Sequence, residues 1–440
     1  MPGDPPPRVP PEALRLGMLF GGGAVVGLWA VQANASADAD VLLATAAHLA
    51  GLLAGYGILV LLLLMARVPA VEHGVGADRL ARWHARGGRF VVGGVAAHAL
   101  LAWGAYLAHT GRGPLGGAAD LLGYPALAAA TAGTVLLLAA GAVSARAVRA
   151  RVSHETWRGV HLLTYAGAAA AFFHQPAGPD LAGIPVLAWL WSLLHAQVAV
   201  LLLWYRAAVP LRAALRHRIR VVDVRSESPD TVSVVMRGRA LAALQAEPGQ
   251  FFRWRFLTRR LWRTALPFSL SAPPVGDTLR ITVKVVGGHT RRVKRLRPGV
   301  RVAAAGPFGA MTARVRTRRK VLLIAGGAGI TPLRALFETL PGGPGDLTLL
   351  YRARTSDQLL LHAELEQIAA GRQCRLHYLL GSSRGPDDPL TAANLRRLVP
   401  DIAEHDVYLC GSPGMADAAS RALRRAGVPP DRVHAEVFAF

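Results

Sequence analysis

The stretch HARGGRFVVGGVAAH, residues 84–98, carries two arginines, then an apolar run, and a histidine at each end. The two histidines stand 14 positions apart, which is about 21 Å along a helix that rises 1.5 Å per residue. An ionisable side chain inside a membrane-crossing helix is costly and by default marks a functional site. The stretch therefore predicts a helix that enters the membrane and holds one imidazole near each membrane face.

Five further apolar segments accompany this one, and each is long enough for the roughly 20 residues that cross a hydrocarbon core. The hydrophobic content of 52% agrees with a membrane part. We expect a cytoplasmic tail at residues 1–13 and a six-helix transmembrane bundle at 14–206. The predicted spans are Leu14–Gln32, Val41–Met65, Phe90–Leu107, Leu121–Val143, Trp157–Phe173 and Ile184–Tyr205.

Arginine placement predicts the orientation of these spans. Arginines cluster between spans two and three, between spans four and five, and after span six, whereas the alternate loops hold only Arg112. By the positive-inside rule, both termini and everything after Tyr205 lie in the cytoplasm, and the protein is a multi-pass protein of the cell membrane. The net charge of +23 is spread over these flanks and over strand-like segments, so we expect no nucleic-acid partner.

The predicted fifth span carries His161 and His174, so two spans offer histidines at two matching depths. A bis-histidine haem needs one imidazole on each side of the porphyrin, and two facing helices can supply them. Because spans three and five run in the same direction, His84 pairs with His161 and His98 pairs with His174. A bulge, a kink or a partly unwound end is required between His161 and His174, because 13 helical residues land about 140° from the starting face.

Other readings of these histidines stay open. His109 lies three turns after His98 and is a rival ligand, and an intramembrane histidine can simply hydrogen-bond a neighbouring helix, as we expect for His48 and His195. The two cysteines lie far apart in the sequence, which excludes a disulfide framework and a cysteine-ligated iron–sulfur cluster. The predicted metal ligands are therefore His84, His98, His161 and His174, holding two b-type haems.

After His217 the hydrophobic pattern changes to short strands separated by glycine and proline turns. These strands predict an antiparallel β-barrel at residues 217–312. The stretch KVLLIAGGAGITPLRALFETL, residues 320–340, then gives a buried strand, a glycine-rich turn and a helix. Later strands alternate with helices, which predicts an α/β doubly wound nucleotide-binding domain at residues 318–440. The chain is thus expected to be a multidomain membrane protein.

Five short motifs occur in the order and spacing of the ferredoxin–NADP reductase superfamily. They are LPFSLSAPP (266–274), VKVVGGHT (283–290), GPFG (306–309), GGAGITP (326–332) and CGSPGM (410–415). With paired histidines on its third and fifth spans, the chain resembles the bacterial membrane flavocytochromes of the ferric reductase and NADPH oxidase type. This resemblance covers nearly everything after the first span and implies FAD, NADPH and two haems as cofactors.

The resemblance also implies roles for individual residues. The flavin would be lined by Pro267, Phe268, Ser269 and Leu270, with Phe268 against the ring and Ser269 near its N5, and approached on its pyrophosphate and adenine side by Lys284 and Thr290. The nucleotide phosphates would be held by Gly326, Gly327, Gly329 and Thr331. The nicotinamide would lie near Cys410 and Gly411, and Phe440 would stack on the flavin ring and yield to nicotinamide.

One position departs from the family pattern, because Leu266 stands where the family usually places arginine or histidine. The flavin phosphate thus loses a partner that Arg255, Arg263 or Lys284 would have to replace.

Arg352 and Arg354 follow the second strand of the nucleotide-binding domain, where an NADP 2′-phosphate is commonly met. Arginine suits phosphate because its planar head makes paired hydrogen bonds. No acidic residue ends that strand, which favours NADPH.

The sequence therefore predicts an oxidoreductase that passes electrons from cytoplasmic NADPH through FAD and two haems to an acceptor outside the membrane. Ferric chelate and dioxygen are equally compatible acceptors. A first alternative is a membrane-anchored, haem-free flavoreductase that supplies a cytoplasmic protein partner. A second alternative is a membrane receptor with a degenerate flavin domain, and Leu266 is its only support.

Overall fold

The computed structural model of the chain describes residues 9–33, 38–381 and 388–438. It divides into two compact units, Met1–Val209 and Pro210–Phe440. After the roles that the sequence predicts for them, we call them the membrane unit and the reductase unit, and we describe each by itself. The division falls just after the predicted end of the membrane domain at residue 206.

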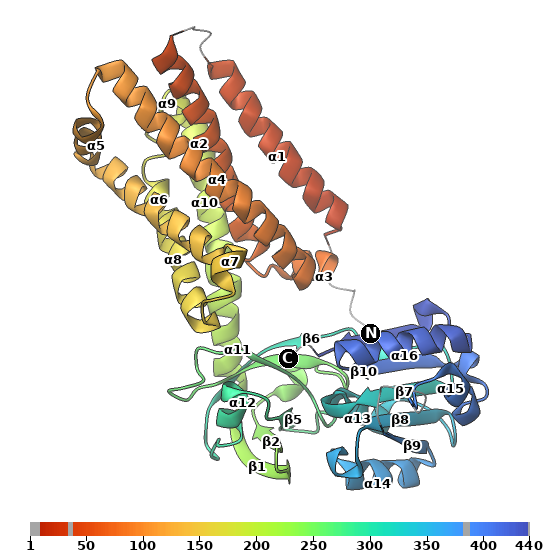
Figure 1. Cartoon of the computed structure of the whole chain (residues 1–440). Coiled ribbons are helices and arrows are strands. Elements are labelled where there is room, and N and C mark those ends of the chain that lie inside the picture. Colours follow the sequence, from red (N-terminus) through yellow and green to blue (C-terminus); the bar gives the residue numbers. More distant parts are fainter. Residues whose placement is uncertain (1–8, 34–37, 382–387, 439–440) are drawn as a thin grey trace. The chain divides into compact units, whose positions relative to one another are not determined.

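The membrane unit is helical in the residues that the structure describes, and its long helices run side by side (Figure 1). Proline in the first turn begins six of its helices, where its missing N–H is no loss. The helices are α1 Pro11–Gln32, α2 Ala39–Leu64, α3 Pro69–Val75, α4 Ala77–Thr110, α5 Pro114–Leu122, α6 Pro125–Ser144, α7 Arg146–Arg149, α8 His154–Phe172, α9 Pro179–Ala182 and α10 Pro185–Leu203. A π-helical turn, Trp204–Ala208, continues α10 into α11, Val209–His217.

Five helices of the described chain, and not the predicted six, are long and apolar enough to cross a membrane: Pro11–Gln32, Ala39–Leu64, Arg79–Thr110, Pro125–Ser144 and Pro185–His217. The prediction of a sixth span at Trp157–Phe173 is corrected. Helix α8 forms there with 19 residues, but Glu155, Arg158 and His161 lower its hydropathy. The composition of α8 therefore does not indicate that it crosses the membrane.

Small residues bring the helices of the membrane unit close together. A side chain at Gly133 of α6 would meet the Gly167 carbonyl oxygen of α8 at 2.7 Å. On α2, a side chain at Gly51 would meet Nδ1 of His98 on α4 at the same distance. Close approach of this kind is the usual way in which membrane helices pack, and here it holds α2 against α4 and α6 against α8.

The first part of the reductase unit consists of two three-stranded antiparallel sheets, ordered β1-β2-β5 and β4-β3-β6. The predicted closed barrel is therefore wrong, although the sheets share one core that includes Phe252, Trp254 and Phe256. Strand β4 has only four residues, one of them a proline without an N–H, and the two sheets meet only at isolated bridges, Leu270↔Ile281 on the β5 side and Arg220↔Arg301 on the β1 side. The elements are β1 Arg220–Ser228, β2 Thr231–Arg237, β3 Phe251–Phe256, β4 Leu266–Ser269, β5 Thr278–Lys284, α12 Gly288–Val293 and β6 Val302–Phe308.

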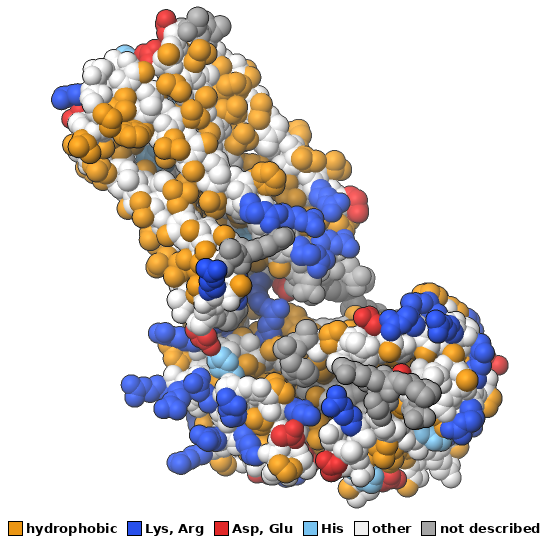
Figure 2. Space-filling view, in the orientation of Figure 1, with side chains coloured by type: hydrophobic (Ala, Val, Ile, Leu, Met, Phe, Trp, Pro, Cys, Tyr) orange, Lys and Arg blue, Asp and Glu red, His pale blue; other side chains and the backbone are white. Residues whose placement is uncertain are grey.

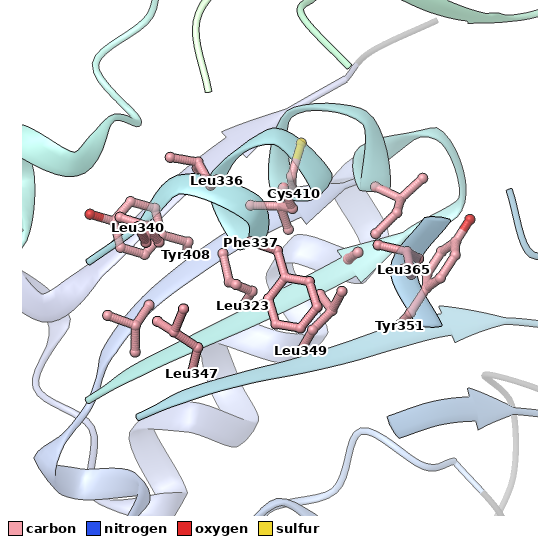
Figure 3. Close-up of a cluster of buried hydrophobic side chains, with 14 of the residues drawn as sticks. Leu323, Leu336, Phe337, Leu340, Leu347, Leu349, Tyr351, Leu365, Tyr408 and Cys410 are labelled. Carbon is pink, nitrogen blue, oxygen red and sulfur yellow. The ribbon is translucent and has the colours of Figure 1, made fainter. Parts of the chain in front are cut away.

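The second part contains a five-stranded parallel sheet in the order β11-β10-β7-β8-β9, which confirms the predicted doubly wound fold. Strand order reverses between β7 and β10, the place where such sheets bind nucleotides. Buried side chains fill both faces, and Figure 3 shows Phe337, Tyr351 and Cys410 in one of these clusters. The elements are β7 Val321–Gly326, α13 Ile330–Thr339, β8 Leu347–Ala353, α14 His362–Arg372, β9 Arg375–Leu380, α15 Ala392–Leu398, β10 Asp406–Gly411, α16 Pro413–Ala426 and β11 Val433–Val437.

Candidate functional site

Two pairs of histidine rings lie between α4 and the α8 region. The ring centroids of His84 and His161 are 5.9 Å apart, and those of His98 and His174 are 6.0 Å apart with planes 22° from parallel. Helix α8 ends at Phe172, so His174 lies in the turn that follows and not on a continuing helix. This ending supplies the unwound segment that the spacing of 13 residues requires.

Backbone carbonyls of α2 fix the two histidines of α4. Nδ1 of His98 lies 2.8 Å from the Ala47 carbonyl oxygen, and Nδ1 of His84 lies 3.2 Å from the Leu61 carbonyl oxygen. A ring nitrogen that faces a carbonyl must carry the proton, so the Nε2 atom of each neutral ring keeps a lone pair. A metal-binding imidazole has this tautomer and this kind of outer partner.

The opposite rings make no competing bonds at Nδ1. Within the described residues, Nδ1 of His161 and Nδ1 of His174 are buried and have no hydrogen-bond partner. The indole of Trp157 stacks on His161, with centroids 5.1 Å apart. The His161 ring is thus held by packing.

The spacing of the pairs fits iron ligated from both sides. Two imidazoles that bind one metal ion from opposite sides, with metal–nitrogen bonds of about 2 Å, have ring centroids about 6 Å apart. The described chain holds no group of three or more His, Cys, Asp or Glu side chains able to bind a metal ion. A haem needs only two protein ligands, because the porphyrin supplies the other four, so these pairs suit haem and do not suit a free ion.

The rival histidines lie elsewhere. His109 is largely exposed and pairs with Asp40, 3.1 Å away, so it does not take the place of His98 in a pair. Nδ1 of His195 on α10 bonds the Trp191 carbonyl, and its ring packs on Phe172 with centroids 4.7 Å apart. Neither belongs to the two pairs.

A cavity of about 450 Å³ lies between α2, α8 and α10. On α8 its wall includes Tyr165, Ala168 and Phe172, which follow His161 by 4, 7 and 11 positions and so share its helix face. His195 and several alanines of α8 and α10 complete the wall. The His161 side of α8 therefore has open, mainly apolar space beside it.

The predicted flavin residues occupy β4 and its surroundings. Ser269 is 3% exposed, and its hydroxyl is buried with no hydrogen-bond partner among the described residues. The Phe268 carbonyl oxygen accepts a hydrogen bond of 2.9 Å from the Trp254 indole, while Pro267 is exposed. Leu270 is fully buried in the core and is therefore not a wall residue. An unused buried hydroxyl fits a polar ring edge such as that of flavin.

Lys284 and Thr290 are engaged locally. The Lys284 ammonium pairs with Asp230 at 3.5 Å, and the Thr290 hydroxyl accepts hydrogen bonds of 3.0 Å from the Val286 and Gly287 N–H groups at the start of α12. Thr290 thus shapes the turn, and any pyrophosphate contact there would have to come from the backbone of the turn or from Lys284 after it leaves Asp230.

The glycine-rich turn after β7 is built for close backbone approach. Gly327 has φ +53°, which favours glycine, and a side chain at Gly329 would collide with the Cys410 carbonyl oxygen of the neighbouring strand β10. The Tyr351 hydroxyl donates to the Gly327 carbonyl oxygen at 3.1 Å, and the buried Thr331 hydroxyl donates to Ala328. The free N–H groups at the start of α13 suit a phosphate.

The two predicted phosphate-binding arginines differ. Arg352 is 7% exposed, and its Nη1 donates to the carbonyl oxygens of Ala353, Leu379 and Gly381. It ties the ends of β8 and β9 together and is not placed to meet a phosphate. Arg354 is exposed, so it is the arginine available for that role.

A carboxylic acid that the sequence did not point to lies beside Cys410, which the sequence predicts to lie near the nicotinamide. Glu436 of β11 stands opposite the fully buried Cys410 in the parallel register, and its Oε1 lies 2.7 Å from where a side chain at Gly309 would begin. Burial raises the pKa of Glu436 to about 7, and burial, together with Glu436, raises the pKa of the Cys410 thiol. An acidic residue in the apolar stretch VHAEVF was the available signal. Phe440 lies outside the described residues.

A second missed group joins the two parts of the reductase unit. The Arg280 guanidinium of β5 donates to both carboxylate oxygens of Glu364 on α14, at 2.7 and 2.8 Å, and Arg334 of α13 pairs with the same carboxylate at 2.8 Å. Burial raises the pKa of Glu364, but the two guanidinium groups hold it below its usual value. This group fixes the flavin part against the nucleotide part.

Comparisons with known families match both units. A family model described as a ferric reductase like transmembrane component matches residues 50–172, which include His84, His98 and His161. A model described as an oxidoreductase NAD-binding domain matches residues 323–421.

Several characterised proteins resemble the second half of the chain. The ferredoxin reductase component of a 3-ketosteroid-9-alpha-monooxygenase from Mycolicibacterium smegmatis is 32% identical over 50% of this chain and 63% of its own length. The reductase component of a naphthalene 1,2-dioxygenase system from Pseudomonas putida is 26% identical over 50% and 70%. An NADPH oxidoreductase of Mycobacterium tuberculosis is 28% identical over 53% and 62%. The chain thus spans less than two thirds of the first of these relatives.

Among solved structures, the ferredoxin reductase in carbazole 1,9a-dioxygenase aligns with 26% identity and a TM-score of 0.42. The alignment covers 51% of this chain and 69% of that one.

Proposed function

Because the chain joins a ferric reductase-like transmembrane component to a NAD-binding domain of the ferredoxin–NADP reductase type, we propose that it is a membrane flavocytochrome. It takes electrons from cytoplasmic NAD(P)H and delivers them through FAD and two bis-histidine haems to an acceptor on the other side of the membrane. The observation that carries this proposal is the pair of ring separations, 5.9 and 6.0 Å, made by the same two helical segments.

The cofactors would supply redox chemistry that side chains lack, since flavin takes an electron pair from a hydride and gives up single electrons, and haem iron carries one electron at a time. The protein's part is to place them. His84 and His98 are oriented by α2 carbonyls, and their separation along α4, about 21 Å, distributes the two pairs over most of a bilayer's hydrocarbon thickness.

In the reductase unit the residues hold protons and exclude water. The unpartnered Ser269 hydroxyl offers a hydrogen bond beside β4. Cys410 is fully buried and remains a neutral thiol. Burial raises the pKa of Glu436 to about 7, so this carboxyl group can give or take a proton near neutral pH where a hydride is exchanged.

A second function is favoured by the relatives, several of which are named as reductase components of oxygenase systems. In that function the chain is a haem-free flavoreductase, its helices anchor it to the membrane, and it supplies a cytoplasmic protein such as a ferredoxin. The histidine pairs would then be structural. The matched transmembrane component and the paired rings support the first function, because an anchor needs neither, whereas the named relatives support the second.

We propose NADPH as the donor, because Arg354 is exposed after β8 and no acidic residue ends that strand. Ferric chelate or dioxygen is proposed as the acceptor. The arginine-rich loops support a place in the cell membrane with the reductase unit in the cytoplasm.

Haem content of the purified full-length protein tests the proposal. The pyridine haemochrome assay should find two b-type haems per chain, and a His195→Leu control should keep both. If the protein, expressed in haem-sufficient cells, contains flavin but no haem, the flavocytochrome proposal is wrong and the anchored reductase takes its place.

A further inference from the structure

The loop at residues 257–263, between β3 and β4, exposes apolar side chains although it is well packed. Leu261 points inward and is 1% exposed, whereas Leu257 and Trp262 are 48% and 49% exposed. Hydrogen bonds of 3.1 Å from the Leu261 N–H to the Thr258 carbonyl and of 2.9 Å from the Thr264 N–H to the Leu261 carbonyl hold the loop in shape. Its outward leucine and tryptophan are therefore features of a folded surface.

Arginines of the loop and of α12 surround these two side chains. Arg292 donates to the Arg260 carbonyl oxygen at 3.4 Å, and His289 lies 3.3 Å from the Thr264 hydroxyl, so the two segments are neighbours. Lysine and arginine side chains gather over the α12 side of the reductase unit in Figure 2. We define the Trp262 face by its exposed members Leu257, Arg259, Arg260, Trp262, Arg291, Arg292 and Arg295.

Charge on this face is of one sign. Between residues 248 and 337 the sequence contains a single acidic residue, Asp277. Among the described residues no carboxylate forms an ion pair with the arginines of the Trp262 face, whereas Arg237 pairs with Asp277 itself. The face therefore keeps its positive charge for a partner outside the unit.

Exposed tryptophan and leucine among arginines match the interface of an anionic membrane. Tryptophan rings prefer the headgroup level, and each basic residue near an anionic leaflet contributes attraction that falls off within a Debye length. Such a membrane is also always near, because the candidate span Pro185–His217 ends three residues before β1 begins at Arg220. A tether of this kind makes docking an intramolecular event.

We propose that the Trp262 face docks on the anionic lipid surface of the membrane that the chain itself spans. The loop leads directly into β4, which carries the proposed flavin contacts Phe268 and Ser269. Docking would therefore fix the height of the flavin site above the bilayer. This inference needs a membrane-spanning chain but needs neither haem nor a particular acceptor.

Quenching by brominated lipids tests the contact in the full-length protein. The protein is placed in nanodiscs of phosphatidylcholine with brominated acyl chains, with and without phosphatidylglycerol. The chain has nine tryptophans, so the signal of Trp262 is obtained by subtracting the spectrum of a Trp262→Phe variant. We expect this difference signal to be quenched when phosphatidylglycerol is present and to recover in high salt. A difference signal that bromine leaves unquenched in both discs overturns the proposal.

Charge variants provide the second measurement. Arg259→Gln/Arg260→Gln should weaken docking by about fivefold per arginine, since each is worth about 1 kcal/mol near an anionic surface. The matched control, Arg421→Gln/Arg424→Gln, removes the same charge from exposed positions of α16 and should leave the quenching unchanged. Equal loss of quenching in both double variants contradicts lipid docking. If Arg259→Gln/Arg260→Gln affects only the reduction of an acidic ferredoxin, lipid docking is also contradicted, and the face is assigned to a protein partner.

Discussion

The two units position their candidate reactive groups by different physical means. In the membrane unit, side chains are oriented by contacts between helices, as when the α2 carbonyls of Ala47 and Leu61 face the rings of His98 and His84. In the reductase unit, the backbone itself forms the site, because the turn at Gly327 and Gly329 lies against β10. The membrane site should thus respond to loss of single side chains, and the nucleotide site to addition of a single methyl group.

The largest effect is expected from His98→Leu. Removing one ligand of the outer pair should reduce the haem content from two to one per chain and abolish reduction of an acceptor across the membrane. Electron transfer from NADPH to a soluble dye at the reductase unit should persist. Haem assay and dye reduction measure the two effects, and His195→Leu is the control. Unchanged haem content in His98→Leu would exclude the outer pair as ligands.

Gly329→Ala tests the backbone site. The new methyl group would collide with the Cys410 carbonyl oxygen, which should displace the turn and lower kcat/KM for NADPH by about 100-fold, as misplacements near 1 Å do. Gly371→Ala in α14, where a side chain meets open space, should be neutral. Steady-state dye reduction measures both, and equal activities would show that the turn does not hold the nucleotide.

Glu436→Gln should change how stability depends on pH. The pKa of Glu436 is raised from 4.5 to about 7 in the folded protein, so the folded state binds the proton more tightly. The stabilisation is fully present below about pH 4.5 and is lost as the pH rises through about 7, which costs the native chain up to about 3 kcal/mol. Glu436→Gln should remove this decline. Thermal unfolding of the reductase unit within the full chain, compared at pH 5 and pH 8, measures it, and parallel declines in both proteins would refute the assignment.

Arg354→Ala should have the smallest effect. If Arg354 binds the 2′-phosphate, its loss should raise the KM for NADPH about tenfold, the worth of a charge-assisted hydrogen bond, and leave the KM for NADH unchanged. Arg375→Ala is a control on the neighbouring strand β9. An equal rise for both nucleotides would mean that Arg354 acts on folding or on a shared part of the dinucleotide.

Much of this arrangement follows from sequence pattern. Histidines in apolar segments stand out because ionisable groups are rare there, and matching their depths leads to the same neighbours that the structure places side by side. The strand–turn–helix pattern of residues 320–340 predicts the glycine turn, and the alternation of strands and helices after it predicts the parallel sheet. The end of α8 at Phe172 follows from the spacing of His161 and His174 and from the stretch QPAG, residues 175–178, whose proline and glycine disfavour a continuing helix.

Other features depend on tertiary packing that pattern does not reveal. Six strands are compatible with a closed barrel, but the two sheets meet only at the isolated bridges Leu270↔Ile281 and Arg220↔Arg301, and β4 is short and contains Pro267. Arg352 has the position expected of a phosphate ligand, but carbonyls of β9 and the turn after it take its guanidinium. Glu436 was missed because one carboxylate in a strand becomes unusual only when the fold buries it.

The most direct test is an anaerobic, NADPH-reduced minus oxidised visible spectrum of the purified, flavin-supplemented protein. We predict sharp low-spin b-type haem bands, part of which should be lost in His98→Leu. Such bands would show that electrons pass from nicotinamide to haems held by the paired histidines. Bleaching of flavin alone, with no haem bands even after dithionite, would contradict the central claim and show the histidine pairs to be structural.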